Sequence, residues 1–285
     1  MSLRVAPPAV ATAEALPEIV SLLERVFPRE RPWGPDLDWQ YLRNPAGPAR
    51  YVNAYAESGA LIAHYGLLPM RPLAEPPVDF AGTYLSLNVA ADPAARVPGL
   101  MVATTRALYR HVQADGRVLI LGVANENAAQ GFIKVLGFRS LGPLSLTVHA
   151  PGALPSIDAP RALADDHAQL MWRSSRPGVT AYGDPAGGAV TVRLRHHGIP
   201  LDAVLSTGLP DETVSRLGLP RPASWAPRLY AGFGGRVRGG VAVPARFRPS
   251  PLEYIFRVLS DNTLTELLSR HLLARRFEFL DFDVV

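Results

Sequence analysis

The chain contains no cysteine among its 285 residues. It therefore has no disulfide bonds, no thiolate ligands for a metal and no cysteine nucleophile. Long apolar runs are also missing, and the longest ones fall well below the roughly 18 residues that a membrane-spanning helix needs. Residues 1–10 lack the apolar core of a secretory signal peptide. We expect a cytoplasmic protein with no membrane partner.

Lysine is nearly absent, with Lys134 as its single occurrence, so that almost all of the 29 basic residues are arginine. Against 25 acidic residues they give a net charge of +4, and they are scattered along the chain. A nucleic-acid-binding protein concentrates basic residues on one face and interleaves aromatic residues for stacking. We therefore expect no nucleic-acid partner. The densest group of basic residues is Arg236, Arg238, Arg246 and Arg248, and we interpret it as a solvated face.

The first part of the chain is predicted to form helices followed by strands. Apolar residues recur at helical spacing over 16–27, and a short helix over 37–42 follows. Residues 51–73 predict a hairpin around the turn at 57–59. Residues 83–90 alternate between apolar and polar, which predicts a strand. The polar side of this strand carries Tyr84, Ser86 and Asn88.

A β-α-β unit comes next. A helical stripe from Val97 to Val112 ends at Gly116, and residues 117–124 predict a fully buried strand. A further helix over 128–136 ends with Gly137 in the C-cap position, and 138–150 supplies one or two closing strands.

Residues 150–166 are rich in proline and have no periodicity, which favours a linker. We therefore divide the chain into a domain over 1–149 and a second lobe over 164–285. The second lobe predicts paired strands, two helices and a terminal strand over 277–285. The expected class is α+β (α/β mixed), with a central mixed sheet and a smaller C-terminal α+β lobe.

The loop before the helix that starts near residue 97 resembles a known anion site. Helix N-termini bind anions because their first N–H groups lack partners within the helix. The loop, Arg96-Val97-Pro98-Gly99-Leu100-Met101, resembles the pyrophosphate loop of the GNAT superfamily of acyl-CoA N-acyltransferases, Gln/Arg-x-x-Gly-x-Gly/Ala. Met101 replaces the usual small residue, and Pro98 removes one donor. Residues 124–138 resemble the second signature of that superfamily, an asparagine that opens a helix ending in Gly-Phe.

The resemblance implies a site for acetyl-CoA, the default donor, or for another acyl-CoA, with no metal. Leu87 and Val89 would offer strand backbone to the pantetheine arm, and Asn125 and Phe132 would flank it. The pyrophosphate would lie on Arg96, Val97, Gly99, Leu100 and Met101. The alternative is an ordinary β-α-β unit in which Arg96 is solvated and Gly99 serves close packing.

Candidates for acid–base catalysis are less specific. Many members of the family have a tyrosine near the leaving sulfur, and Ile133 stands at that position here. The candidates are Tyr84, which could instead be a packing residue, Asp283, and the C-terminal carboxylate of Val285. Asp281 and Asp283 would share one side of the terminal strand, where they could bind a cationic amine or simply face solvent.

Other polar residues have a structural interpretation beside the functional one. We interpret His64 as a strand histidine hydrogen-bonded to its neighbours rather than a base, and Asp92, before a proline, as a turn residue. His196 and His197 point to opposite sides of a strand and cannot readily share a metal. Two roles are equally compatible with Trp33, Trp39 and Tyr41. These residues could line a pocket for the acceptor substrate, or they could anchor a loop.

The sequence thus predicts an N-acyltransferase, by default an N-acetyltransferase, that moves an acyl group from CoA to a primary amine of a small molecule by direct attack in a ternary complex. The alternatives are a non-catalytic GNAT-fold protein that binds a ligand or partner, and a transferase that uses an acyl carrier protein as donor. The second lobe would be a degenerate GNAT-like unit that shapes the acceptor site. A homodimer is compatible with each of these functions.

Overall fold

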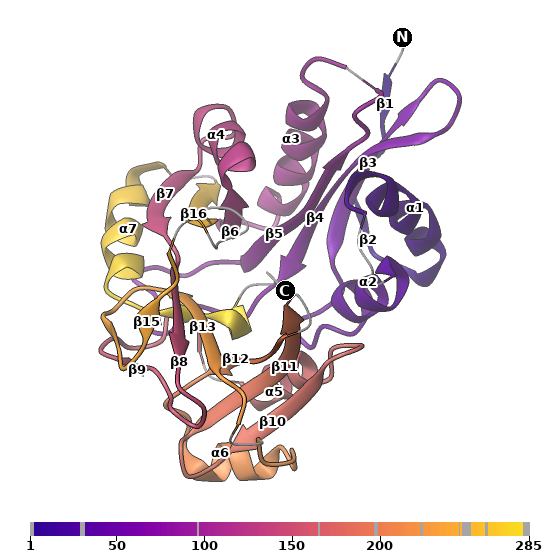
Figure 1. Ribbon diagram of the computed structural model, residues 1–285. Helices are drawn as coiled ribbons and strands as arrows, with labels where there is room; N and C mark the ends of the chain where they lie inside the picture. Colours follow the sequence, from indigo (N-terminus) through magenta and orange to yellow (C-terminus); the bar gives the residue numbers. More distant parts are fainter. Residues whose placement is uncertain are drawn as a thin grey trace.

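The computed structural model consists of two mixed β-sheets with helices packed against them (Figure 1). It describes residues 3–28, 32–95, 97–164, 166–196, 199–222, 225–244, 246, 252–259 and 262–281. The combination of mixed sheets with helices confirms the predicted α+β class. In the described ranges, no helix is long and apolar enough to span a membrane.

The first sheet is eight-stranded, in the order β1-β3-β4-β5-β6-β16-β7, with β2 paired to β3. Its strands are β1 (Leu3–Val5), β2 (Ala9–Val10), β3 (Arg50–Ala56), β4 (Leu61–Pro69), β5 (Gly82–Ala91), β6 (Val118–Asn125), β16 (Leu252–Leu259) and β7 (Arg139–Pro143). The β5–β6 pair is parallel and the other pairs of this sheet are antiparallel. A parallel pair needs a crossover, and the predicted helix between these two strands supplies it.

Helices cover both faces of this sheet because its central strands are apolar on both sides. Leu119 and Leu121 of β6 belong to one core, which includes residues of α1 (Leu16–Val26) and α2 (Trp33–Leu42). Val118 and Ile120 belong to the core on the other face, with residues of α3 (Leu100–Gln113) and α4 (Glu126–Lys134). The period of two along β6 therefore separates an α1/α2 face from an α3/α4 face (Figure 1).

The second sheet has the order β10-β11-β12-β13-β8-β15, and β17 pairs with β13. Its strands are β10 (Thr180–Asp184), β11 (Ala189–His196), β12 (Ile199–Ser206), β13 (Arg228–Phe233), β8 (Ser145–His149), β15 (Val241–Ala242) and β17 (Phe277–Glu278). β9 (Ser156–Ile157) pairs with β14 (Val237–Arg238). The helices α5 (His167–Ser174) and α6 (Asp211–Arg216) contact β10 of this sheet, whereas α7 (Thr265–Leu273) contacts β7 of the first sheet.

The two sheets exchange strands across the domain boundary that we expected. β16 comes from the C-terminal part of the chain and lies between β6 and β7 of the first sheet, whereas β8 leaves the first part and joins the second sheet. The later part of the segment predicted as a linker is packed, although many of its other described residues are exposed. Ala162 and Leu163 in it are buried, and Leu163 forms a bridge with Leu73.

The C-terminal segment differs from the prediction of a long strand over 277–285. Among the described residues of this segment, 277–281, the strand is limited to Phe277–Glu278, and a 3-10 helix over Phe279–Asp281 follows. Residues 282–285 of the predicted strand lie outside the described part of the chain. The turn forms because the Asp281 Oδ2 accepts a hydrogen bond from the Glu278 N–H at 2.9 Å, in the manner of a cap. Asp281 is buried and paired with Arg71 at 2.6 Å. It is therefore not part of a solvated strand face.

Candidate functional site

The central feature of the first sheet is a gap between its two parallel strands. Pairing runs from Gly82 with Val118 to Ser86 with Gly122, and no described pairing joins residues 87–91 to 123–125. Both strands keep their outer partners to the end, because β5 still pairs with β4 at Ala91 and β6 with β16 at Asn125. Only the inner edges separate, so β5 residues 87–91 have no described pairing partner on their β6 side.

Exposure supports an open gap at this place. Residues 86–89 lie in the middle of a central strand, yet each is partly exposed, whereas residues 83–85 just before them are buried. A central strand of a sheet that is covered on both faces is normally buried throughout. The splayed segment is therefore accessible along the part where Leu87 and Val89 were predicted to offer backbone to a pantetheine arm.

A helix N-terminus lies at the end of the splayed strand. Gly99 is the N-cap residue of α3, with a left-handed backbone at φ +74° that favours glycine, and a Cβ there would meet no atom within 4 Å. The first turn of α3 contains no acidic residue. The positive end of the helix dipole is thus not neutralised by its own side chains, as an anion site requires.

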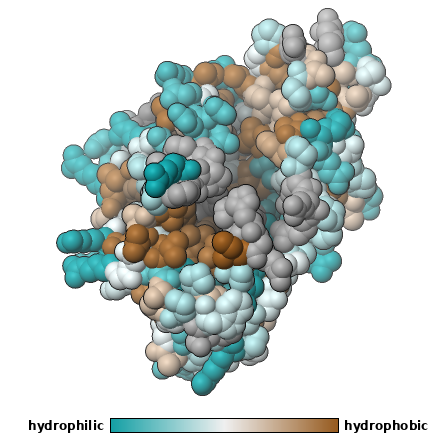
Figure 2. Space-filling view, viewed as in Figure 1, coloured by the Kyte–Doolittle hydropathy of each residue, from teal (hydrophilic) through white to brown (hydrophobic). Residues whose placement is uncertain are grey.

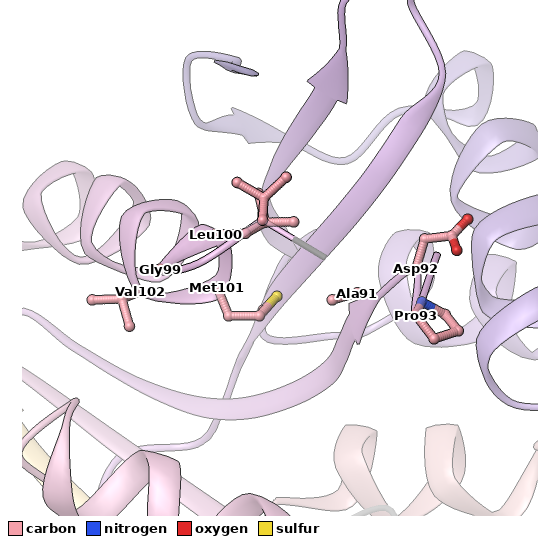
Figure 3. A pocket seen from close by; sticks show the side chains of 8 residues that line it. Ala91, Asp92, Pro93, Gly99, Leu100, Met101 and Val102 are labelled. Atoms are coloured by element: carbon pink, nitrogen blue, oxygen red, sulfur yellow. The ribbon is translucent and has the colours of Figure 1, made fainter. Parts of the chain in front are cut away.

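A pocket of about 360 Å³ opens at this helix end. It is lined by Ala91, Asp92, Pro93, Val97, Gly99, Leu100, Met101 and Val102, so it includes each described residue predicted to hold the pyrophosphate. In Figure 3 the Met101 side chain extends toward Ala91 across the pocket. The remaining loop prediction, Arg96, lies outside the described residues. The prediction for Asp92 is confirmed as a turn, because its Oδ1 accepts from the Ala94 N–H at 2.9 Å.

The second signature forms the expected helix beside the gap, with a different use of its asparagine. The helix spans Glu126–Lys134 instead of 128–136, because the Asn125 Oδ1 caps it by accepting from the Ala128 N–H at 2.9 Å. Phe132 is buried and packs edge-to-face on Phe138, with 5.0 Å between ring centroids. Asn125 thus stands at the end of β6 beside the gap with its side chain engaged, while Phe132 is a core residue.

Asn88 turns away from the side of β5 where its neighbours lie. The pairing of β4 with β5 shifts register between His64 and Gly66, so that two β5 residues, 88 and 89, oppose one β4 residue. Asn88 has φ +52°, a left-handed conformation that asparagine tolerates better than most residues. We expected Asn88 on the same side as Tyr84 and Ser86. The bulge instead turns its side chain to α2, where Nδ2 lies 3.1 Å from Gln40 Oε1 and 3.3 Å from Tyr41 Oη.

A chain of buried polar side chains continues behind Asn88. The Tyr41 hydroxyl lies 2.7 Å from His64 Nε2, and His64 Nδ1 lies 2.7 Å from Asn53 Oδ1. Asn53 Nδ2 donates to Glu18 Oε1 at 3.0 Å. Burial lowers the pKa of His64 to about 3 and raises that of Tyr41 well above its ordinary range. His64 is therefore a neutral, hydrogen-bonded strand histidine, as predicted.

Of the three predicted catalytic residues, the described part of the chain includes Tyr84, which does not line the pocket. Tyr84 lies near the start of β5, in the core on the α3/α4 face, with the Arg50 guanidinium 5.9 Å from the centre of its ring. Burial raises the pKa of Tyr84, which fits the packing interpretation. Asp283, Val285 and His197 lie outside the described residues. Ile133, which was predicted to replace a tyrosine near the leaving sulfur, lies on α4.

Trp39 is an anchor rather than a wall of the pocket. Its indole is buried and stacks on that of Trp172. Sequence reasoning missed Gln40, Asn53 and Gly66 altogether. The signal that could have found the network is Gly66 itself, because a glycine inside a strand often marks a close approach, and a Cβ there would lie 2.2 Å from the Tyr41 hydroxyl.

Comparison with known proteins is informative at the level of structure only. No family model and no curated protein sequence matches the chain. A GCN5-related N-acetyltransferase from Anabaena variabilis superposes with a TM-score of 0.52 at 10% identity, over 89% of this chain and 72% of that one. A probable N-acyltransferase from Enterococcus faecalis, described as a conserved protein of unknown function, gives 0.50 at 12% identity, over 93% and 74%.

Both similarities extend over most of the chain, beyond the residues that carry the sequence motifs. The chain therefore has the fold of the GNAT acyl-CoA N-acyltransferases.

Proposed function

We propose that the protein transfers an acyl group, by default acetyl, from CoA to a primary amine of a small molecule. The observation that carries this proposal is the adjacency of two features: the unpaired inner edge of β5 beyond Ser86, and the open N-terminus of α3 that follows the same strand. A pantetheine arm presents amides that can pair with a strand edge, and a pyrophosphate is an anion suited to a helix end.

The residues at the helix end fit such an anion. A side chain on Gly99 would project into the space where the anion must approach the backbone, and its absence leaves that space open. The first-turn N–H groups of Met101 and Val102 have no acceptor one turn earlier in the helix. These groups would hold the pyrophosphate, and the backbone of Leu87 and Val89 would hold the pantetheine.

The reaction needs little from the protein beyond position and polarisation. A neutral amine nitrogen attacks the thioester carbonyl carbon, a C–N bond forms and the C–S bond breaks. The amine loses one proton and the leaving thiolate gains one, so the products are an amide and free CoA. Because Ile133 replaces the tyrosine that the family has near the sulfur, we propose that solvent in the accessible gap supplies that proton.

A turnover assay tests the proposal. Acetyl-CoA is mixed with the protein and each of five amines, namely ethanolamine, lysine, glucosamine, tyramine and spermidine, and free thiol is measured. We expect amine-dependent thiol release with at least one of them. CoA binding without release across the panel would favour the second candidate, a non-catalytic binding protein, for which the presence of Ile133 is the supporting observation.

A further inference from the structure

The buried chain behind Asn88 has only one self-consistent direction of hydrogen bonding. Glu18 at its outer end is a carboxylate, which accepts hydrogen bonds and donates none. Asn53 Nδ2 and the Tyr55 hydroxyl both donate to Glu18 Oε1, at 3.0 and 2.7 Å. The Asn53 amide is therefore oriented with its nitrogen toward Glu18 and its carbonyl oxygen toward His64.

That orientation propagates inward one residue at a time. Since Asn53 Oδ1 is an acceptor, His64 must carry its proton on Nδ1, and a neutral imidazole then has an unprotonated Nε2. The Tyr41 hydroxyl donates to that Nε2 at 2.7 Å. The lone pairs of the same hydroxyl then face Asn88 Nδ2, 3.3 Å away.

The chain ends by fixing the amide of Asn88. Both of its N–H groups are directed at acceptors on α2, Gln40 Oε1 and Tyr41 Oη. In a planar amide the oxygen then points away from these two partners. Gln40 and Tyr41 are buried, whereas Asn88 is partly exposed within the accessible stretch 86–89. The Asn88 Oδ1 thus belongs to an amide that is fixed on the α2 side of the splayed, partly exposed stretch of β5, and it is free to accept a hydrogen bond.

We propose that Asn88 Oδ1 accepts a hydrogen bond from the amine substrate, and that Tyr41, His64, Asn53 and Glu18 are positioning residues that set the orientation of its amide. This inference rests on the proposed function. An amine that gives one N–H to Asn88 has its rotation restricted, so that its lone pair can be held toward a thioester in the gap. The ligand class, a primary amine, is that of the proposed function, and an acceptor at this position suits its N–H groups.

Gly66 provides a way to disturb the chain without changing any of its members. The Tyr41 hydroxyl lies over Gly66, and a Cβ on residue 66 would be 2.2 Å from it. Gly66→Ala therefore displaces Tyr41 from both His64 and Asn88. Gly34→Ala is the matched control, because Gly34 lies on the same helix as Tyr41 and a Cβ there meets nothing within 4 Å.

The first measurement needs no substrate. The ¹⁵N shifts of His64 in the full chain report its tautomer, and we expect the proton on Nδ1 with Nε2 unprotonated. A proton on Nε2 would reverse the direction of the chain and overturn the inference.

The second measurement is steady-state kinetics with acetyl-CoA and the best amine of the panel. Asn88→Gly keeps the left-handed bulge, which glycine adopts freely, and removes the carbonyl oxygen. We expect KM for the amine to rise about tenfold, the effect of one lost hydrogen bond, with the Kd for CoA changed less than about twofold. Gly66→Ala should shift KM in the same direction and Gly34→Ala should not.

The outcomes separate this inference from the proposed function. Turnover in the wild type with an unchanged KM in Asn88→Gly overturns the inference and leaves the function standing. No wild-type turnover with any amine contradicts the proposed function and this inference with it.

Discussion

Trp39 of α2 and Trp172 of α5 are bound to each other reciprocally. Their rings stack with 4.4 Å between centroids, Trp39 Nε1 donates to the Trp172 carbonyl oxygen at 2.9 Å, and Trp172 Nε1 donates to the Trp39 carbonyl oxygen at 3.1 Å. The two residues lie 133 positions apart in the chain. This pair fixes α2, which carries Gln40 and Tyr41, to a helix of the second part of the chain.

Trp172→Phe should therefore destabilise the protein measurably. It keeps an aromatic ring for stacking but removes one donor and leaves a buried carbonyl oxygen without a partner, which costs about 1–3 kcal/mol. The free energy of unfolding from urea titration measures the loss. Trp225→Phe is the control, because Trp225 is 59% exposed, and a surface change of this kind should stay within about 0.5 kcal/mol. Equal losses in both variants would contradict the bridging function of Trp172.

A second prediction concerns Arg71, which follows β4, and Asp281, which lies in the C-terminal segment. Their ion pair joins these two parts of the chain. Their side chains are 3% and 5% exposed and lie 2.6 Å apart. Arg71→Met leaves the carboxylate buried without its counter-charge, so the free energy of unfolding should fall by about 3–5 kcal/mol. Arg216→Met removes the exposed partner of Glu212, and it should change stability by less than about 1 kcal/mol. If Arg71→Met matches Arg216→Met in urea unfolding, the buried pair does not anchor this segment.

His64 gives a prediction about pH. Its pKa is about 3 in the folded chain against an ordinary 6.5, so between these values the unfolded chain binds more protons than the folded one. The stabilising contribution of neutral His64 is complete above the higher pKa. This contribution to the free energy of unfolding is lost as the pH falls below the higher pKa, at up to about 1.4 kcal/mol per pH unit.

The difference between wild type and His64→Gln isolates this effect from other titrating groups. The free energy of unfolding of the variant should fall less steeply than that of the wild type between about pH 7 and pH 5. Substitution of the exposed His167 by Gln should leave the slope of the wild type unchanged. Parallel slopes for wild type and His64→Gln would show that His64 titrates normally.

Much of the site was predictable because it is local in sequence. The β5-α3-β6 unit follows from the periodicities of residues 83–124, and Gly99 was identified by the resemblance of its loop to a pyrophosphate-binding motif. The turn at Asp92 was also predicted, because it depends on neighbouring residues. His64 was predicted as a hydrogen-bonded strand residue, although its partners Tyr41 and Asn53 come from other elements.

What could not be predicted depends on pairing between distant segments. Alternation places Asn88 beside Tyr84 and Ser86, and only the register shift against β4 turns it to α2. Nothing near residues 252–259 indicates that this strand lies between β6 and β7. The prediction of a long terminal strand was wrong for a related reason. Asp281 accepts a hydrogen bond from the Glu278 N–H and pairs with Arg71, which is 210 positions away.

Titration calorimetry with CoA tests the central claim most directly. We predict that the wild type binds CoA with a Kd below about 1 mM, and that Gly99→Glu abolishes binding by placing a negative charge at the helix end. Gly59→Glu is the matched control, since Gly59 also has a positive φ, +82°, and open space around a Cβ, and it should bind CoA as the wild type does. No heat of binding from the wild type at about 1 mM CoA, or undiminished binding by Gly99→Glu, would contradict the assignment of this helix end and splayed strand as the acyl-CoA site.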